Sequence, residues 1–121
     1  MATDRRWDLA TCNDRLVAFR EARDWAKFHA PKELAAALAI EAGELQETML
    51  WKSNEEVAAL LAQPEFRAQF EEEIADVAMC VLMLAERTGV DLRAAIMAKI
   101  DANERRYSVE EHRGVAKKAP K

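Results

Sequence analysis

The chain has 121 residues; half of them are apolar, a third are charged, and the formal net charge at pH 7 is −4. This length predicts one domain with a hydrophobic core, and the acidic balance argues against broad binding to a nucleic-acid polymer. The most apolar stretch, residues 74–85, is too short to cross a membrane. Because the N-terminus also lacks an apolar signal sequence and the two cysteines lack a CxxC spacing, we expect a soluble cytoplasmic protein with reduced thiols and no membrane partner.

Five helical segments are predicted in chain order, and no stretch alternates with the period of a β-strand. Pro31 separates the first two segments, and Ser53-x-x-Glu56 is a capping box that opens the short third one. Gly89 is suited to end the fourth helix in a left-handed conformation, and Asp91 is suited to cap the fifth. The predicted helices cover about residues 12–28, 32–51, 53–62, 64–88 and 92–105.

The predicted fold class is therefore all-α: a short helical bundle with about four main helices and one short helix. We expect a flexible N-terminal segment over residues 1–11, the folded domain over residues 12–107, and a polar C-terminal tail over residues 108–121 that is disordered from Glu110 onward. A chain this short closes a bundle more easily with a partner, so we expect a homo-oligomer, either a tetramer or a dimer.

Two pairs of carboxylates interrupt the apolar stripes of the second and fourth helices. The pairs are Glu41-x-x-Glu44 and Glu73-x-x-Asp76, and residues three apart on a helix lie side by side. Glu41 continues the stripe of Leu38, so the first pair faces the predicted core. Four carboxylates turned toward a core would repel one another unless a cation compensated them. The pattern therefore predicts a metal site, although a lone ExxE motif is more often a solvated helix face.

The donor types indicate which metal such a site would hold. Carboxylate oxygens suit Mg²⁺ or Mn²⁺, whereas soft or tetragonal sites would use Cys and His. A di-iron bundle needs Glu-x-x-His, but the residues three before His29 and His112 are Ala26 and Val109. Since protein-bound Mg²⁺ usually meets the phosphates of a substrate, the expected ligand is phosphorylated.

Other residues are candidates for contacts with such a ligand. Lys99, Asn103 and Arg106 share one face of the fifth helix by their i, i+4, i+7 spacing, and would hold phosphates. Trp25 and Trp51 would stack on a flat base. Each has an ordinary alternative: the charges pair on the surface, and the tryptophans belong to a core or an interface. Gly43, inside the second helix, indicates a close backbone approach, space for a ligand, or a tolerated weak point.

With these residues in place, the sequence resembles the MazG-type all-α nucleoside triphosphate pyrophosphohydrolases, most closely their dCTP pyrophosphatase-like branch. The resemblance extends over about residues 12–114 and includes ExxE, a spacer, and ExxD in that order. The matching stretches are FREARDWAKFH (19–29), PKEL (31–34), ALAIEAGELQE (37–47), LWK (50–52), EEIADV (72–77) and KIDANERRY (99–107).

The resemblance implies Mg²⁺-dependent hydrolysis of a nucleoside triphosphate, with dCTP or a modified dCTP preferred, to the monophosphate and pyrophosphate. Two positions depart from the branch: Leu16 stands where it has a histidine, and Cys80 where it has a tyrosine. The alternatives are another nucleotide, such as dUTP or phosphoribosyl-ATP, or a non-catalytic helical interaction module. The residues implied to bind metal and to act in catalysis are Glu41, Glu44, Glu73 and Asp76, with Glu47 and Glu72 in support. The residues implied to bind substrate are Trp25, Trp51, Lys99, Asn103, Arg106 and Tyr107.

Overall fold

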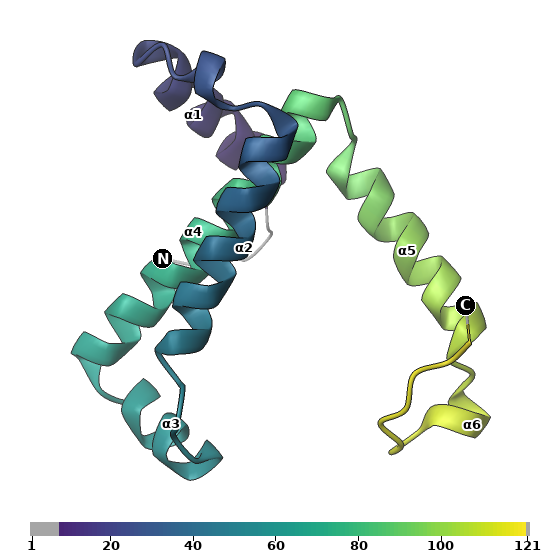
Figure 1. Cartoon of the computed structure of the whole chain (residues 1–121). Coiled ribbons are helices and arrows are strands. Elements are labelled where there is room, and N and C mark those ends of the chain that lie inside the picture. The colour runs from purple at the N-terminus through teal and green to yellow at the C-terminus, as the bar shows by residue number, and fades with distance from the viewer. Residues whose placement is uncertain (1–7, 121) are drawn as a thin grey trace, which may run out of the picture. The chain divides into compact units, whose positions relative to one another are not determined.

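The computed structural model describes residues 8–120, and every regular element in that part of the chain is helical (Figure 1). The all-α fold class is therefore confirmed. None of these helices is both long enough and apolar enough to cross a membrane. The elements in order are α1 (Leu9–Ala22), η1 (Ala26–Phe28, a 3-10 turn), α2 (Pro31–Glu47), α3 (Asn54–Leu61), α4 (Pro64–Thr88), α5 (Leu92–Arg106) and α6 (Val109–His112).

The chain divides into two compact units, Met1–Gly89 and Val90–Lys121. The first unit contains α1 to α4, and the second contains α5, α6 and the segment that follows. Each unit is described by itself below.

The third, fourth and fifth helices lie where the sequence predicts them, for the expected local reasons. The Ser53 hydroxyl accepts a hydrogen bond from the Glu56 backbone N–H at 3.1 Å, and the Asp91 carboxylate accepts one from the Ala94 N–H at 3.0 Å. Gly89 ends α4 in the left-handed region with φ 71°, a conformation that costs other L-residues free energy.

The predicted bounds of the first two helices are wrong at three ends. The first helix begins at Leu9 because Asp8 caps it: the Asp8 carboxylate accepts a hydrogen bond from the Thr11 N–H at 3.2 Å. Of the flexible segment expected over residues 1–11, residues 1–7 lie outside the described residues, and residues 9–11 are helical. The helix ends at Ala22 rather than near residue 28, since Asp24 adopts φ 53° and breaks the helical geometry. The second helix ends at Glu47, and turns follow it to Trp51.

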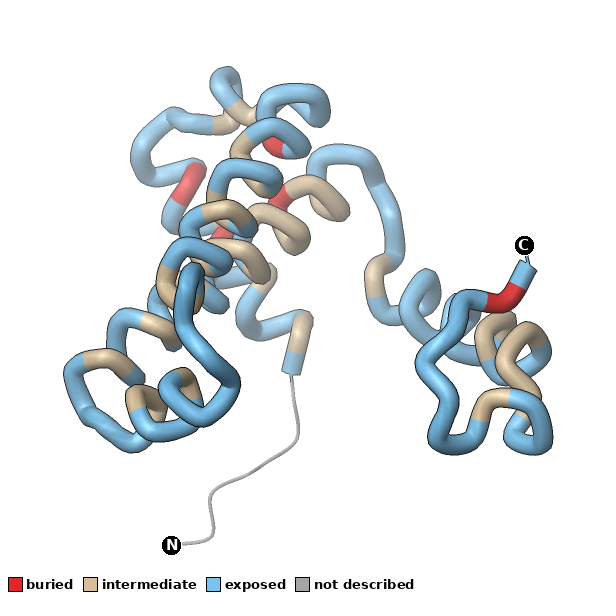
Figure 2. Tube along the Cα trace, turned by 60° about the horizontal axis from the view of Figure 1, so that its bottom comes forward, coloured by how far each residue is buried: buried red, intermediate tan, exposed pale blue. Residues whose placement is uncertain are grey.

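The core of the first unit forms where α2 lies along α4 and α1 contacts α4 from another side. Each of these three helices contributes one buried side chain to the core: Leu16 from α1, Leu34 from α2 and Met83 from α4. The partly buried side chains of Leu82 and Leu84 pack against them. Figure 2 shows how short the buried segments are among partly buried and exposed ones. Many large apolar side chains remain exposed, including Ile40 at 62% and Ile74 at 44%.

The buried side chain of Arg20 links α1 to α4. The Arg20 side chain is only 3% exposed, and its Nη1 donates to the Glu86 carboxylate at 2.5 Å. Its Nη2 donates to Glu21 at 2.6 Å, and Nη1 also lies 3.2 Å from the Met83 sulfur. A buried guanidinium is tolerated only when its donors are paired in this way.

The second unit differs from the prediction after Tyr107. Disorder is expected from Glu110 onward, but Val109–His112 form a short helix, and the described chain continues beyond it to Pro120. The His112 ring meets Tyr107 edge to face at 5.0 Å, and Arg106 donates to backbone carbonyls of the last described residues. These contacts join residues at irregular spacings in the sequence, so no periodic pattern predicts them. The polar composition of the tail therefore predicts disorder.

Candidate active site

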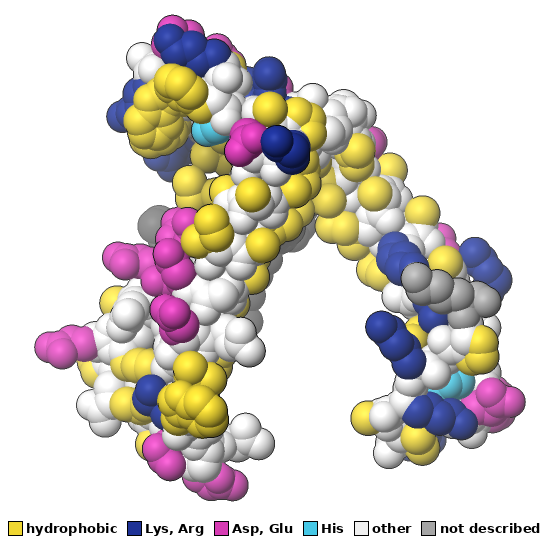
Figure 3. Space-filling model, viewed as in Figure 1, with side chains coloured by type: hydrophobic (Ala, Val, Ile, Leu, Met, Phe, Trp, Pro, Cys, Tyr) yellow, Lys and Arg dark blue, Asp and Glu magenta, His cyan; other side chains and the backbone are white. Residues whose placement is uncertain are grey.

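The packing of α2 against α4 brings carboxylates from both helices to one place. One oxygen each from Glu41, Glu73 and Asp76 lies within 4.8 Å of the others. Figure 3 shows acidic side chains gathered over this face of the α2–α4 pair. The juxtaposition follows from the helical spacing of the two motifs once the two stripes face each other.

Two oxygen atoms of this cluster are buried and have no hydrogen-bond donor among residues 8–120. They are Oε2 of Glu41 and Oε2 of Glu73. Buried polar atoms are nearly always paired, so an unpaired carboxylate oxygen indicates a missing partner of positive charge. An all-oxygen donor set of this kind fits a hard divalent cation such as Mg²⁺ or Mn²⁺.

The electrostatics agree with this interpretation. The pKa of Glu41 is raised, first by the hydrogen bond that its protonated carboxyl shares with Glu44, then by burial and by the charges of Glu44, Asp76 and Glu73. The pKa of Glu73 is raised first by burial and then by the charges of neighbouring carboxylates, Glu44 and Asp76 foremost. Each shift reflects negative charge held close together without a cation.

Glu44 lies beside this cluster, where a polar hollow opens toward solvent. The charges of Glu72 and Glu47 also raise the pKa of Glu73, and the supporting role of these two carboxylates at a metal stays a prediction. Outside its own helix, no described residue lies within 4 Å of a Cβ built on Gly43, so the described chain makes no close backbone approach at this glycine and leaves open space there. The residues that line the hollow are Glu44, Glu47, Thr48, Gln69 and Glu73.

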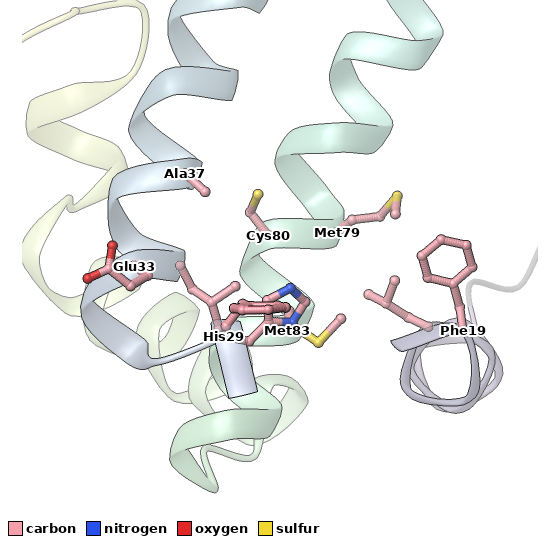
Figure 4. Close-up of a pocket in the computed structure, with 10 residues that line it drawn as sticks. Phe19, His29, Glu33, Ala37, Met79, Cys80 and Met83 are labelled. Carbon is pink, nitrogen blue, oxygen red and sulfur yellow. The ribbon is translucent and has the colours of Figure 1, made fainter. Parts of the chain in front are cut away.

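An apolar pocket of about 230 Å³ lies between α1, η1, α2 and α4 (Figure 4). Cys80 joins it to the acidic cluster: burial raises the pKa of this thiol, and the charges of Glu41 and Asp76 raise it further. The Nδ1 atom of His29 is buried, and within the part of the chain that the structure describes it has no hydrogen-bond partner. The pocket is lined by Leu16, Phe19, Phe28, His29, Glu33, Leu34, Ala37, Met79, Cys80 and Met83.

Sequence reasoning missed most of this pocket. A signal was present, since Met79, Cys80 and Met83 follow Asp76 by three, four and seven residues and so continue its face of α4. His29 carried no such signal, because its position depends on the turn that follows Asp24. Leu16 and Cys80, the two departures from the family pattern, line this same pocket.

The structure does not bring the two predicted stacking residues together within one chain. Trp25 is 43% exposed and lies edge to face with Phe19, at 5.7 Å between ring centroids. Trp51 lies in the turn beyond the other end of α2, 93% exposed, with the uncommon φ of 63°. Since α2 has 17 residues, the helix between them is about 25 Å long.

The remaining predicted substrate residues belong to the second unit, and their place beside the carboxylates stays a prediction. Lys99 is exposed, and Asn103 is half-buried. Arg106 donates to the carbonyl oxygens of Ala119 at 2.8 Å and Pro120 at 3.2 Å, and its guanidinium lies 5.2 Å from the Tyr107 ring centroid.

Known proteins are similar to this chain in sequence and in fold. The dCTP pyrophosphatase 1 of Rattus norvegicus is 44% identical over 98 residues, which are 81% of this chain and 58% of that protein. The human dCTP pyrophosphatase 1 is 43% identical over 89 residues, 74% of this chain and 52% of that protein. The crystal structure of a pyrophosphatase from Archaeoglobus fulgidus matches with a TM-score of 0.77 and 33% identity, over 89% of this chain and 99% of that one.

The chain thus spans little more than half the length of the dCTP pyrophosphatases that it matches. The sequence model of the MazG-like family matches residues 36–120, a range that contains both carboxylate motifs. Since this match extends over most of the sequence, the chain belongs to the MazG-like family.

Proposed function

We propose that the protein is a nucleoside triphosphate pyrophosphohydrolase that converts dCTP, or a modified dCTP, to the monophosphate and pyrophosphate. The observation that carries the proposal is the carboxylate cluster of Glu41, Glu73 and Asp76, with two buried oxygens that lack a partner. The family membership and the names of the relatives, dCTP pyrophosphatase 1, support the reaction and the base.

In this proposal Glu41, Glu44, Glu73 and Asp76 would hold Mg²⁺, with Mn²⁺ as the alternative. When bound, the cation would neutralise triphosphate charge and lower the pKa of a coordinated water. Glu41 or Glu44 accepts a proton from the attacking water, whose oxygen bonds to the α-phosphorus as the bond to the bridging oxygen breaks. Lys99 and Arg106 stabilise the leaving pyrophosphate, and Asn103 and Tyr107 contact the sugar and phosphates.

The apolar pocket beside Cys80 would receive the base. Its lining of thioethers, a thiol and aromatic rings is apolar and suits the flat face of a base. The Nδ1 atom of His29 offers one polar contact. Leu16 and Cys80 leave fewer polar groups there than a histidine and a tyrosine would. This is the feature that favours a modified base, and it also keeps dUTP and phosphoribosyl-ATP as alternative substrates.

A pyrophosphate-release screen tests the proposal directly. The full chain is assayed with the common dNTPs, 5-substituted dCTPs and phosphoribosyl-ATP, each with Mg²⁺, with Mn²⁺ and with a chelator. We expect metal-dependent release that is fastest with dCTP or a substituted dCTP. No release from any nucleotide, together with no Mg²⁺-dependent change in melting temperature, would instead indicate a non-catalytic helical interaction module.

We further propose that the protein works as a homo-oligomer, a tetramer or a dimer. The exposed apolar side chains of the first unit, Ile40 and Ile74 among them, support self-association. Because Trp25 and Trp51 lie beyond opposite ends of α2, a single base could contact both only if one tryptophan came from another copy.

Trp51→Ala is expected to raise the KM for the nucleotide about tenfold and to leave the melting temperature unchanged or slightly higher. Stacking of a base on an aromatic ring contributes about 1–3 kcal/mol, whereas a side chain that is 93% exposed contributes little to folding. Steady-state kinetics and thermal unfolding measure the two effects. Trp51→Phe is the matched control and should keep most of the affinity; an unchanged KM in Trp51→Ala would exclude this residue from substrate binding.

A further inference from the structure

Two donors of the Arg106 guanidinium are already occupied by the chain's own backbone. Its Nε donates to the carbonyl of Pro120 at 3.2 Å, and its Nη2 donates to the carbonyl of Ala119 at 2.8 Å. These two donors form the fork with which arginine holds one carboxylate or phosphate in a bidentate manner. Two consecutive carbonyl oxygens of residues 119 and 120 thus take the place that an anion would take.

The path of residues 114–120 is built to reach this position. The chain leaves α6 and runs back toward the end of α5 (Figure 1). Gly114 makes the reversal with φ 73°, in the left-handed region. At the far end Ala119 is buried, at 9% exposure. The segment is therefore anchored at a turn and at the arginine, with the exposed Lys117 and Lys118 between them.

We propose that residues 114–120 form an autoinhibitory strap, which must leave Arg106 before the Nε–Nη2 fork of this side chain can hold the phosphates of the nucleotide. The carbonyl oxygens are neutral, whereas hydrogen bonds from a guanidinium to phosphate are charge-assisted and about twice as strong. A polyphosphate therefore displaces the strap. The apparent KM equals the KM of the released form divided by the fraction of time that Arg106 is free of the strap. The competition rests on the proposed function; the contact itself does not.

Limited trypsin digestion of the full chain, followed by intact mass, tests the contact, because cleavage after Lys117 or Lys118 requires a free strap. Arg106→Gln is expected to shorten the tail about tenfold faster than wild type, since it removes both hydrogen bonds to a charged donor. The exposed neighbour Arg105 gives the matched control: Arg105→Gln also removes one trypsin site and should digest like wild type. Equal tail cleavage in the two variants would overturn the proposal.

Gly114→Val releases the strap without touching Arg106. Nothing lies within 4 Å of a Cβ at Gly114, so the valine acts through its positive φ alone. We expect about tenfold faster tail cleavage, and a KM for the nucleotide about fivefold lower at unchanged kcat. Arg106→Gln should instead raise the KM. A loosened tail with an unchanged KM in Gly114→Val would exclude competition with substrate.

Tail cleavage in the presence of tripolyphosphate tests the strap independently of nucleotide hydrolysis. Added without metal, it should speed tail cleavage of wild type and leave the rate in Arg106→Gln unchanged, whether or not any nucleotide is hydrolysed. A wild-type tail that tripolyphosphate does not loosen would overturn the strap even in an active enzyme. An inactive wild type with a tail that tripolyphosphate releases would contradict the proposed function and leave the strap supported.

Discussion

Glu73→Gln is expected to reduce pyrophosphate release about 100-fold or more and, at the same time, to raise the melting temperature of the metal-free protein. Loss of one group that stabilises developing charge typically costs two to three orders of magnitude in kcat. Without metal, the same group only adds repulsion, because Glu73 lies among Glu44, Asp76 and Glu72 with a buried oxygen that has no donor. A neutral amide of the same shape removes that repulsion.

The raised pKa of Glu73 determines in which direction the stability of the metal-free protein changes with pH. Burial and neighbouring charges raise the pKa of Glu73 in the folded chain, so the folded state holds this proton more tightly than the unfolded state does. The resulting stabilisation is complete below the ordinary glutamate pKa of about 4.3 and is lost as the pH rises through the raised pKa. Thermal unfolding of the metal-free wild type should therefore show falling stability over this window, and Glu73→Gln should show a smaller fall.

Mg²⁺ should reverse the order of the melting temperatures of wild type and Glu73→Gln. A cation that binds only the folded state stabilises it in proportion to the logarithm of its concentration, so Mg²⁺ should raise the melting temperature of wild type and have little effect on Glu73→Gln. Glu65→Gln is the matched control, since Glu65 is exposed on the same helix and its loss changes the net charge equally. Full turnover in a folded Glu73→Gln protein, or an equal response of both variants to Mg²⁺, would remove Glu73 from the metal site.

The carboxylate cluster could be predicted from sequence because it depends only on helix periodicity. Glu41 and Glu73 each sit within an apolar stripe, and two such stripes must face each other in any compact all-α unit. The ends of α3, α4 and α5 were equally predictable, because Ser53, Gly89 and Asp91 act on their own backbone neighbours.

The parts that escaped prediction depend on backbone breaks with no strong local signal. Asp24 adopts a left-handed conformation without being a glycine, which ends α1 early and places His29 in the apolar pocket. Trp51 does the same beyond α2, against the low tolerance of bulky residues for positive φ. Arg106 and Ala119 are thirteen residues apart and follow no period, so their contact required the structure.

Arg20→Met is expected to lower the free energy of unfolding by about 3 kcal/mol, the lower end of the range for breaking a buried ion pair. The methionine keeps most of the apolar stem, so the loss comes from the charge and its hydrogen bonds. Glu86 is left without its partner but is 29% exposed, which lets water compensate part of the loss. Because α1 also brings Leu16 and Phe19 to the apolar pocket, the KM for the nucleotide should rise with the loosening of this helix.

Urea unfolding followed by circular dichroism measures the effect, and Arg23→Met is the matched control. Arg23 is exposed on the same segment and lies over the Phe19 ring at 3.8 Å, so its loss should cost less than about 1 kcal/mol. A double-mutant cycle with Glu86→Gln isolates the pair, whose coupling should exceed about 1 kcal/mol at neutral pH. Equal destabilisation in Arg20→Met and Arg23→Met would show that the buried pair does not hold α1.

Acid should weaken this coupling in a defined direction. The hydrogen bond from Arg20 lowers the pKa of Glu86 in the folded chain, and the charge of Arg20 adds to the effect. A carboxylate with a lowered pKa contributes its full stabilisation above the ordinary glutamate pKa and loses it as the pH falls through the lowered value. The difference in stability between wild type and Glu86→Gln should therefore be constant near neutral pH and shrink below about pH 4. The pKa values of Glu41 and Glu73 are raised instead of lowered, so these glutamates of the carboxylate cluster change stability in the opposite sense over their own pH window. The pH at which each variant departs from wild type therefore distinguishes the Arg20–Glu86 pair from the carboxylate cluster.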